Sequence, residues 1–314
     1  MSASTAPSST AGSVHSILIA PGEDLCSFFN AREFLKYKRP GMCIRVGYTD
    51  KDSPFVKELE RMGAEMVQFD LDDMSSMQRM YEGMTCAAIS PPTFCSNYSK
   101  STKIIEAALK AKDLKRVAMM SLLHADKLRD LDRLRPICDM EKMFERGMEK
   151  WDGACIMRLS AALESFYTMC RMIQENREMP WPTRDQKVAP VSYREVAKVV
   201  RCMLMKEKHE GDIEVISDDD SDSEAESPVI TVSLADEAAR PRHCLKCNFT
   251  GAREYSGEEL ARECSRALST EIHLKAMSPK EYAECLKKTG ELADQYVKTT
   301  EQIAEAIHKG LWQG

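Results

Sequence analysis

Short apolar runs alternate along the chain with longer segments in which apolar residues recur every three or four positions. The runs end at glycine, proline or polar residues, so they predict buried strands, and the longer segments predict amphipathic helices. The predicted strands span residues 14–20, 42–46, 66–69, 86–89, 117–120 and 154–157. The predicted helices span residues 24–38, 54–62, 74–81, 96–112, 131–148 and 161–174.

This alternation of strand and helix, with short connections, predicts a parallel sheet that is covered by helices on both faces. The fold class is therefore α/β, a doubly wound parallel sheet of the Rossmann-like kind. Such a sheet binds ligands in the crevice beyond the carboxyl ends of its strands, where the strand order reverses. In this chain we expect that point beside the first and fourth strands.

The regular alternation of strand and helix ends after residue 178, which predicts a smaller α+β C-terminal lobe over residues 179–314. Its predicted elements are a rigid loop at 179–183, strands at 188–191 and 213–216, and helices at 193–205, 256–268, 279–288 and 291–309. Residues 229–232 are either a further strand or an exposed apolar patch. The first domain then spans residues 14–178, and residues 1–13 form a disordered tail rich in Ser, Thr and Ala.

Composition narrows the class of protein. Of the 314 residues, 43% are apolar and 30% are charged, which is typical of a packed globular core. The formal net charge of -6 argues against broad electrostatic binding to nucleic acid. No apolar run reaches the length that spans a membrane, and the first 13 residues lack the features of a secretory signal. We expect a cytoplasmic protein, with the nucleus as an alternative location.

The 12 cysteines are scattered through predicted helices and strands, which favours reduced thiols over a disulfide framework. Cys244 and Cys247, preceded by His243, have the spacing of one half of a zinc site. A structural zinc site needs four ligands, usually from two such pairs, and the sequence has no second pair. We therefore interpret these cysteines as buried thiols on a strand and expect no metal.

An acidic, serine-rich tract at residues 217–228 interrupts the second lobe. It contains too few apolar residues to be buried, so we expect a disordered insertion. Ser217, Ser221 and Ser223 each have an acidic residue three positions later, a spacing that resembles the sites of acidophilic kinases. The tract is either a phosphorylated loop that docks on a basic surface of a protein partner or an inert solvated loop.

Several segments, taken in order, resemble the NmrA-like branch of the atypical short-chain dehydrogenases. Residues 63–73 are similar to the family's third strand and the turn that follows it, and residues 104–108, 114–117 and Ser121 resemble one of its helix–strand pairs. Arg158 stands where the family has an arginine at the end of the sixth strand, and residues 250–261 resemble a segment of its second lobe. The resemblance implies that residues 14–178 form an NAD(P)-binding domain.

The resemblance also implies a glycine-rich phosphate loop after the first strand, and here the chain departs from the family. Pro21, Asp24 and Ser27 stand at the three glycine positions, and Gly22 lies one place away. Proline removes an N–H donor, and the carboxylates of Glu23 and Asp24 lie where phosphate is expected. We expect weak pyrophosphate binding. The alternative interpretation of Asp24 is an ordinary cap at the start of a helix.

The cofactor, if one binds, is either NAD or NADP. Thr49 stands where NADP-preferring members have arginine, and Asp50 is placed to hold a ribose hydroxyl, which favours NAD. The resemblance places a set of residues around the cofactor. These are Gly22, Asp24, Leu25, Thr49, Asp50, Asp70, Leu71, Ser90 and Pro91.

The catalytic pair of short-chain dehydrogenases, a Tyr with a Lys four residues later, is missing near the helix after the fifth strand. Glu141 resembles the family's helical glutamate, but Ile137 replaces the lysine often found before it. Ser121 and His124 are the only catalytic candidates. No third group is placed to orient this pair, and a local hydrogen bond of His124 is the competing interpretation.

These departures favour a redox-linked regulator or scaffold, a pseudoenzyme that keeps the fold and works through a protein partner. The alternative is an active NAD(P)-dependent oxidoreductase of the atypical short-chain dehydrogenase type, with a small molecule in the cleft between the lobes. A third hypothesis is a structural module that binds no nucleotide.

Overall fold

The structure is a computed structural model. It describes residues 15–91, 100–205, 231–234, 244–288, 290, 292 and 294–312.

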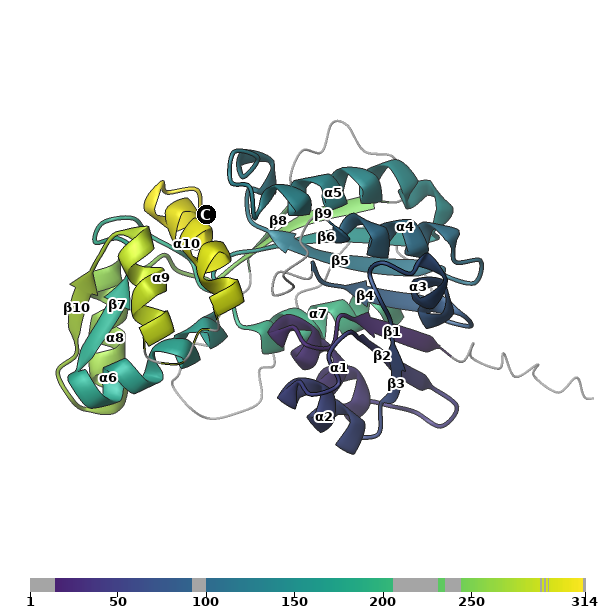
Figure 1. Ribbon diagram of the computed structural model, residues 1–314, viewed down its shortest axis with the longest axis horizontal. Coiled ribbons are helices and arrows are strands. Elements are labelled where there is room, and N and C mark those ends of the chain that lie inside the picture. The colour runs from purple at the N-terminus through teal and green to yellow at the C-terminus, as the bar shows by residue number, and fades with distance from the viewer. Residues whose placement is uncertain are drawn as a thin grey trace, which may run out of the picture.

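Eight strands form one large sheet in the order β3-β2-β1-β4-β5-β6-β9-β8. Seven of them run parallel, and β8 pairs antiparallel with β9 at one edge. Their bounds are β1 Ser16–Ala20, β2 Cys43–Tyr48, β3 Glu65–Gln68, β4 Cys86–Ile89, β5 Arg116–Leu122, β6 Gly153–Leu159, β8 Thr231–Leu234 and β9 Cys244–Thr250. The strand order reverses between β1 and β4, which confirms the predicted doubly wound fold (Figure 1).

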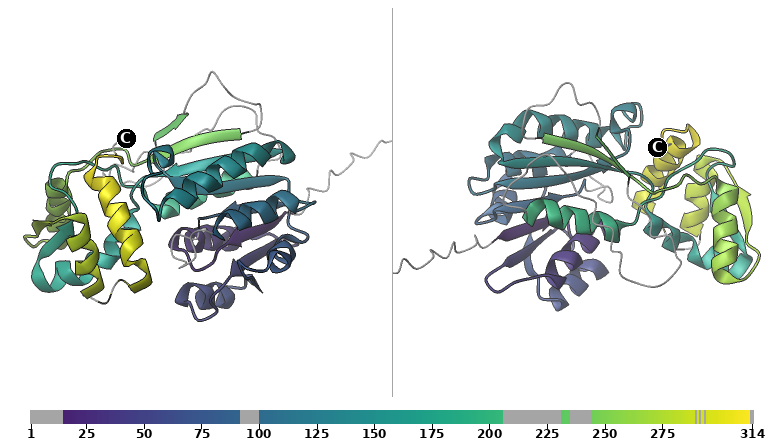
Figure 2. Two further views of the ribbon diagram at one scale, coloured as in Figure 1. Left: turned by 45° about the horizontal axis from the view of Figure 1, so that its top comes forward. Right: turned by 180° about the vertical axis from the view of Figure 1, so that it is seen from behind.

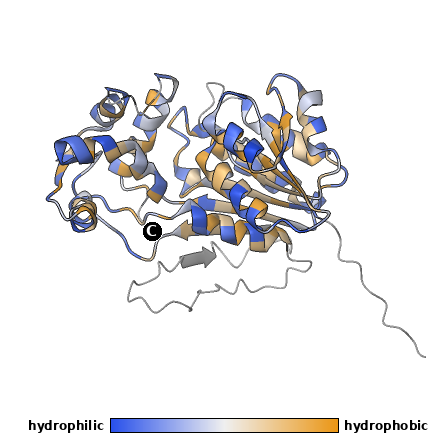
Figure 3. Ribbon diagram, turned by 90° about the horizontal axis from the view of Figure 1, so that it is seen from below, coloured by the Kyte–Doolittle hydropathy of each residue, from blue (hydrophilic) through white to orange (hydrophobic). Residues whose placement is uncertain are grey.

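Helices cover both faces of this sheet because alternate strand residues point to opposite sides. Ile17 and Ile19 of β1 join a core with α1, α2 and α7, whereas Leu18 and Ala20 join a core with α3, α4 and α5. The helices are α1 Leu25–Lys36, α2 Pro54–Arg61, α3 Met74–Tyr81, α4 Thr102–Lys110, α5 Arg135–Gly147 and α7 Tyr193–Met205, with short 3₁₀ turns at Ala125–Lys127 and Met148–Lys150. In Figure 3 the strands of the sheet are largely apolar, whereas the helices contain both apolar and polar residues.

A second, smaller lobe packs beside the sheet (Figure 2). It contains a two-stranded parallel sheet of β7 and β10, surrounded by helices. Its elements are the 3₁₀ helix Leu163–Met169, α6 Cys170–Asn176, β7 Glu178–Trp181, α8 Gly257–Leu268, β10 His273–Ala276, α9 Pro279–Lys288 and α10 Asp294–His308. Trp181 is buried at its centre, stacked on Phe166 and edge-on to Tyr282. The predicted smaller α+β lobe is thus confirmed.

Some predicted elements of this region were wrong. The loop expected at 179–183 begins within β7, whose partner β10 lies far along the chain, so no local pattern indicated the pairing. Pro180 also argued against a strand there, although it is tolerated in a sheet of only two strands. The helix expected at 161–174 is a 3₁₀ helix followed by α6, and residues 188–191 make only isolated bridges.

The division expected between residues 178 and 179 does not follow the packing. After β7 the chain returns to the large sheet, where Val196 and Val200 of α7 and Phe249 of β9 enter the core of the first unit. The chain then crosses again to build α8, β10, α9 and α10. The expected tail at 1–13, the strand at 213–216 and the acidic tract lie outside the described residues.

Candidate functional site

The turn after β1 lies at the carboxyl edge of the sheet and packs tightly against β2. The Gly22 N–H donates to the Gly47 carbonyl at 2.8 Å. A Cβ atom at Gly22 would come within 2.5 Å of the Val46 side chain, and one at Gly47 within 2.2 Å of Met80 Sδ. Only glycine fits at these two positions, so the turn is held close to the end of β2.

Asp24 is the N-cap of α1. Its carboxylate accepts hydrogen bonds from the backbone N–H of Cys26 at 3.3 Å and of Ser27 at 2.9 Å. The cap interpretation of Asp24 is thereby confirmed. The residue is only 5% exposed, and this burial raises the pKa of its carboxyl group, although the hydrogen bonds from Ser27 oppose the shift.

Glu23 reaches across from the same turn to the loop after β2. Its Oε1 accepts from the Thr49 hydroxyl at 2.9 Å and from the Asp50 N–H at 2.6 Å. It also accepts a short hydrogen bond from the Thr49 N–H. The second carboxylate oxygen, Oε2, is buried and has no hydrogen-bond partner within the described part of the chain.

Together these two carboxylates use the donors with which such a fold holds a dinucleotide. The N–H groups at the start of the first helix normally face the pyrophosphate, and the end of the second strand normally faces the ribose. Here Asp24 occupies the N–H groups of Cys26 and Ser27, and Glu23 occupies those of Thr49 and Asp50. The chain itself therefore supplies the anions at both positions.

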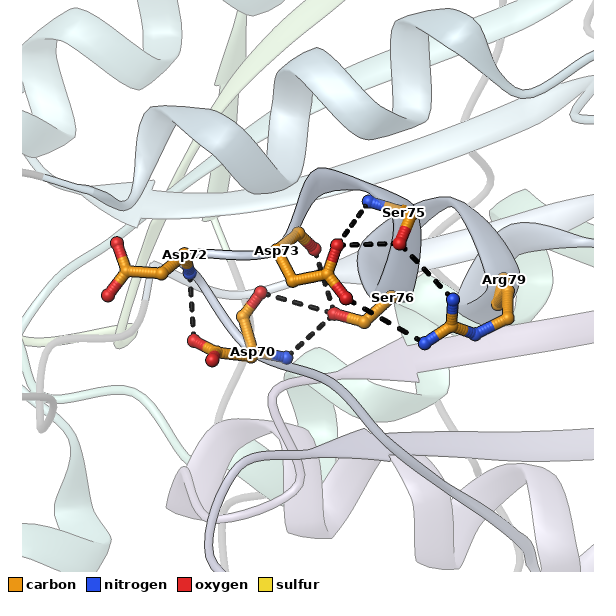
Figure 4. Close-up of polar contacts among 6 residues, drawn as sticks. All are labelled: Asp70, Asp72, Asp73, Ser75, Ser76 and Arg79. Atoms are coloured by element: carbon orange, nitrogen blue, oxygen red, sulfur yellow. Dashed lines mark hydrogen bonds and ion pairs between the residues drawn. The ribbon is translucent and has the colours of Figure 1, made fainter.

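The turn after β3 contains Asp70 and Leu71, and it is arranged as a helix cap (Figure 4). Asp70 Oδ1 accepts from the Asp72 N–H at 2.8 Å, and Asp73 caps α3 by accepting from the Ser75 N–H at 2.9 Å. Leu71 is buried, and its carbonyl accepts from Lys103 Nζ at 3.1 Å. The exposed Asp70 carboxylate lies at the same sheet edge as Glu23.

A buried polar group lies beneath the turn after β1. The hydroxyls of Ser27 and Ser90 are 3.0 Å apart, which joins α1 to the end of β4. Asn30, on the next turn of α1, is fully buried and its Oδ1 has no partner within the described residues.

Glu164 caps α7 by accepting from the Ser192 hydroxyl and the Tyr193 N–H. Burial raises the pKa of the Tyr193 hydroxyl well above its usual range.

Ser121 lies at the carboxyl end of β5, but its hydroxyl is already engaged. It is 2.5 Å from Glu141 Oε1 of α5, and the guanidinium of Arg158 on β6 contacts both oxygens of Glu141, at 2.9 and 2.7 Å. The side chains of Arg158 and Glu141 are only 9% and 5% exposed. This bidentate, buried ion pair holds β5, β6 and α5 together.

His124 lies just beyond Ser121 in a left-handed backbone conformation, with φ 53°. The next turn carries Asp126, whose Oδ1 is 2.8 Å from Arg158 Nη1. Lys246 of β9 completes the cluster by pairing with Glu145. Around Ser121, the described contacts are therefore those of an ion-pair network.

The structure thus brings most of the expected cofactor residues to one edge. The turns after β1, β2, β3 and β4 carry Gly22, Asp24, Leu25, Thr49, Asp50, Asp70, Leu71, Ser90 and Pro91. The roles of Glu23, Glu164 and Tyr193 were missed, because each depends on contacts between segments far apart in sequence. Ser217, Ser221 and Ser223 lie outside the described residues.

The described residues include no group of three His, Cys, Asp or Glu side chains that could hold a metal ion. Cys247 is a buried free thiol on β9, as the sequence predicted. In the part of the chain that the structure describes, no helix combines the length and apolar character needed to cross a bilayer.

Comparisons with known proteins support the fold. No family model matches the sequence, and no curated relative matches it. Among solved structures, an NADPH-dependent quinone oxidoreductase from Escherichia coli, complexed with NADPH, has a TM-score of 0.68 at 16% identity and covers 95% of this chain and 91% of its own. A Citrobacter triphenylmethane reductase complexed with NADP(H) has a TM-score of 0.68 at 14% identity, covering 96% and 92%.

A nucleoside-diphosphate-sugar epimerase from Staphylococcus aureus has a TM-score of 0.66 at 12% identity, and the alignment covers 96% of this chain and 92% of the epimerase. At such low identities, these likenesses establish only the α/β fold, which the chain shares with these reductases and this epimerase. The narrower NmrA-like family remains an inference from the sequence segments.

Proposed function

We propose that this protein is a regulator or scaffold built on a dinucleotide-binding fold, and that it does not transfer hydride. The observation that carries the proposal is the double occupation of the cofactor edge by Glu23 and Asp24. Their carboxylates accept from the N–H groups of residues 26, 27, 49 and 50. A pyrophosphate or a ribose phosphate would have to displace them.

Electrostatics makes this displacement unfavourable. Two unit charges about 4 Å apart repel by about 4 kcal/mol at an effective dielectric constant of about 20. Asp24 is nearly buried, so water screens its charge little. A dinucleotide that carries two or three phosphates would meet two fixed carboxylates where the fold normally offers N–H donors. NADP(H) meets the larger penalty, since its extra phosphate would lie near Glu23 at the end of β2.

The surroundings of Ser121, the expected substrate-facing residue, support the same proposal. Ser121 is hydrogen-bonded to Glu141, which is itself held by Arg158. A hydroxyl in this position donates to a carboxylate that is already part of a buried ion pair, so it is poorly placed to polarise a substrate carbonyl. The chain therefore keeps the dinucleotide-binding fold. The groups that would bind the cofactor, and the hydroxyl that would contact a substrate, are instead hydrogen-bonded to side chains of the protein itself.

The alternative is an active NAD(P)-dependent oxidoreductase with an unusual site. It is supported by the fold that the chain shares with the quinone oxidoreductase, which binds NADPH, and with the triphenylmethane reductase, which binds NADP(H). In that case the Glu23 carboxylate would swing away from Thr49 and Asp50 when cofactor enters.

Calorimetric titration of the full chain with NADPH and NADH, followed by a turnover assay with a quinone, tests the proposal. We expect dissociation constants above about 100 μM, corresponding to less than about 5.5 kcal/mol of binding free energy, and no oxidation of either cofactor. Micromolar binding with turnover would overturn the proposal in favour of the oxidoreductase. Micromolar binding without turnover would be consistent with a regulator, but it would contradict the claim that Glu23 and Asp24 block the cofactor edge.

A further inference from the structure

The outer surface of α1 and α7 concentrates positive charge. These two helices lie side by side on one face of the large sheet (Figure 2). Their acidic residues are only Glu33 and Glu195. Their basic residues are Arg32, Lys36, Arg194, Lys198 and Arg201, all exposed or half-buried. We refer to these five residues as the basic face.

Aromatic rings hold several of these cations in place. Lys36 Nζ lies 5.0 Å from the ring centre of Tyr37, and Arg201 Cζ lies 4.2 Å from the same ring. The ring is 45% exposed, so both cations remain at the surface. Arg32 lies over Phe28 and Arg194 over Phe29, each at 5.5 Å. Cation–π contacts of this kind position a charge without neutralising it.

The two carboxylates on the same helices offset only part of this charge. Glu33 pairs with Arg201 at 2.9 Å, and Glu195 lies one helical turn from Lys198. On the opposite face of the sheet, α5 is balanced internally, with Arg135, Lys142 and Arg146 against Asp139, Glu141 and Glu145. The basic face is therefore a local feature and does not reflect the whole surface, since the chain carries a net charge of -6.

An acidic segment follows α7 directly in the sequence, and the described residues on either side of it are placed in the sheet. Helix α7 ends at the amino edge of the sheet, where the Leu204 carbonyl accepts from Cys86 at the start of β4. The chain re-enters the sheet at Thr231, which pairs with Thr250 at the carboxyl end of β9. The described residues on either side of 206–230 therefore lie at opposite edges of the sheet, a span that α7 covers in the opposite direction.

That connection contains residues 217–228, the acidic tract. Its charged residues are all acidic: Asp218, Asp219, Asp220, Asp222, Glu224 and Glu226. From Met205 an extended chain reaches at most about 40 Å before Ser217, whereas α7 is about 20 Å long. The tract can thus reach every residue of the basic face without leaving its own chain.

We propose that the acidic tract docks, within the same chain, on the basic face formed by α1 and α7. Each ion pair at such a surface is weak, but several pairs made by a tethered segment benefit from an effective concentration on the order of millimolar. Phosphorylation at Ser217, Ser221 or Ser223 would add about -1.5 to -2 charges each and strengthen the docking. This inference is independent of whether the cofactor edge, formed by the turns after β1 to β4, binds a cofactor.

Zero-length carbodiimide cross-linking of the full chain, followed by mass spectrometry, tests the docking. We expect cross-links from the acidic tract to Lys36 and Lys198 in monomeric protein at low salt. They should fall at least about fivefold in 1 M salt, where the Debye length is about 3 Å. Cross-links that join two different copies, or that reach Lys142 as often as Lys198, would overturn the proposal.

Proteolysis gives a second readout that does not depend on lysine chemistry. A glutamate-specific protease cuts after Glu224 and Glu226, so docking should slow cleavage there. The double variant Lys36→Glu with Lys198→Glu should be cut about tenfold faster than the wild type at low salt. The matched control, Lys142→Glu with Arg146→Glu on α5, should be cut at the wild-type rate, provided that both variants keep the wild-type circular dichroism. Equal rates in all three proteins would contradict docking.

Discussion

Two regions at the carboxyl edge of the large sheet both contain buried or half-buried carboxylates, but their carboxylates are paired in opposite ways. At the turn after β1, Glu23 and Asp24 are held by N–H and hydroxyl donors. At the ends of β5 and β6, Glu141 is held by the guanidinium of Arg158. A carboxylate held by neutral donors fills an anion site and can be exchanged for another anion. A carboxylate held by a buried cation is part of the fold.

The difference predicts where substitution harms folding and where it changes binding. Breaking a buried ion pair leaves an uncompensated charge, which costs far more than losing an exposed one. Removing a carboxylate from N–H donors at a helix start leaves those donors free for water or for a ligand anion. The largest expected effect therefore lies at Arg158 and the smallest at the exposed cap of α3.

Arg158→Met should lower the free energy of unfolding by about 3–5 kcal/mol, since it strands the Glu141 carboxylate in a buried site. Urea denaturation of the full chain measures this change. The control is Arg171→Met, which breaks the exposed Arg171–Glu175 pair and should cost less than about 1 kcal/mol. A second substitution, Glu141→Leu, should restore much of the stability lost in Arg158→Met. A loss below 1 kcal/mol for Arg158→Met would refute the structural role of the pair.

The double variant Glu23→Ala with Asp24→Asn should bind NADPH at least about tenfold more tightly than the wild type, a gain of about 1.4 kcal/mol. It frees the N–H groups of Thr49 and Asp50 and removes one charge from the start of α1. Calorimetry should show a larger gain for NADPH than for NADH. Asp52→Asn, which removes a nearby exposed charge but frees none of these donors, should leave both affinities within about twofold. Equal gains in the control would mean that only net charge matters.

Asp24→Asn and Asp73→Asn should change stability with opposite sign at neutral pH, although asparagine caps a helix about as well as aspartate. Burial raises the pKa of Asp24 when the protein folds, so its charged form loses stability as pH rises from about 3.8 through the raised value. Asp24→Asn should therefore be more stable than the wild type near pH 7, and this advantage should shrink towards pH 4.

The hydrogen bond from Ser75 lowers the pKa of Asp73, so that carboxylate contributes stability above about pH 3.8 and loses it as pH falls through the lowered value. Asp73→Asn should be slightly less stable than the wild type near pH 7. Denaturant titrations at pH 4.5 and pH 7.5 measure both variants. A stabilising effect of both substitutions at pH 7.5 would contradict the contrast between a buried and an exposed cap.

How far the sequence predicted this molecule depends on the distance between interacting residues. The sheet followed from short continuous apolar runs that alternate with helical patterns, because burial on both faces makes each strand a continuous apolar run. The cap at Asp24 was also local. The contact of Glu23 with Thr49 and Asp50 was not predicted, since it depends on the fit of Gly22 against β2.

The second lobe shows the same limit. The sequence predicts a loop where β7 forms, because its partner strand β10 lies about 95 residues further along the chain. Glu141 and Arg158 were each singled out through the resemblance, but nothing in their spacing indicated that they pair with each other or that Ser121 joins them. Pairings across the sheet become visible only once the strands are placed.

One oxygen of Glu23 accepts from three donors, so a single side chain closes this part of the cofactor edge, and this has an evolutionary consequence. Glutamate and glycine codons differ by a single base, so one point mutation would withdraw the carboxylate and leave the donors of Thr49 and Asp50 open. The ribose end of the cofactor edge could then be opened or closed in one step, without a change in the core, while Asp24 would still occupy the start of α1. Descendants of such a protein need not share their parent's ligand even where they share every strand.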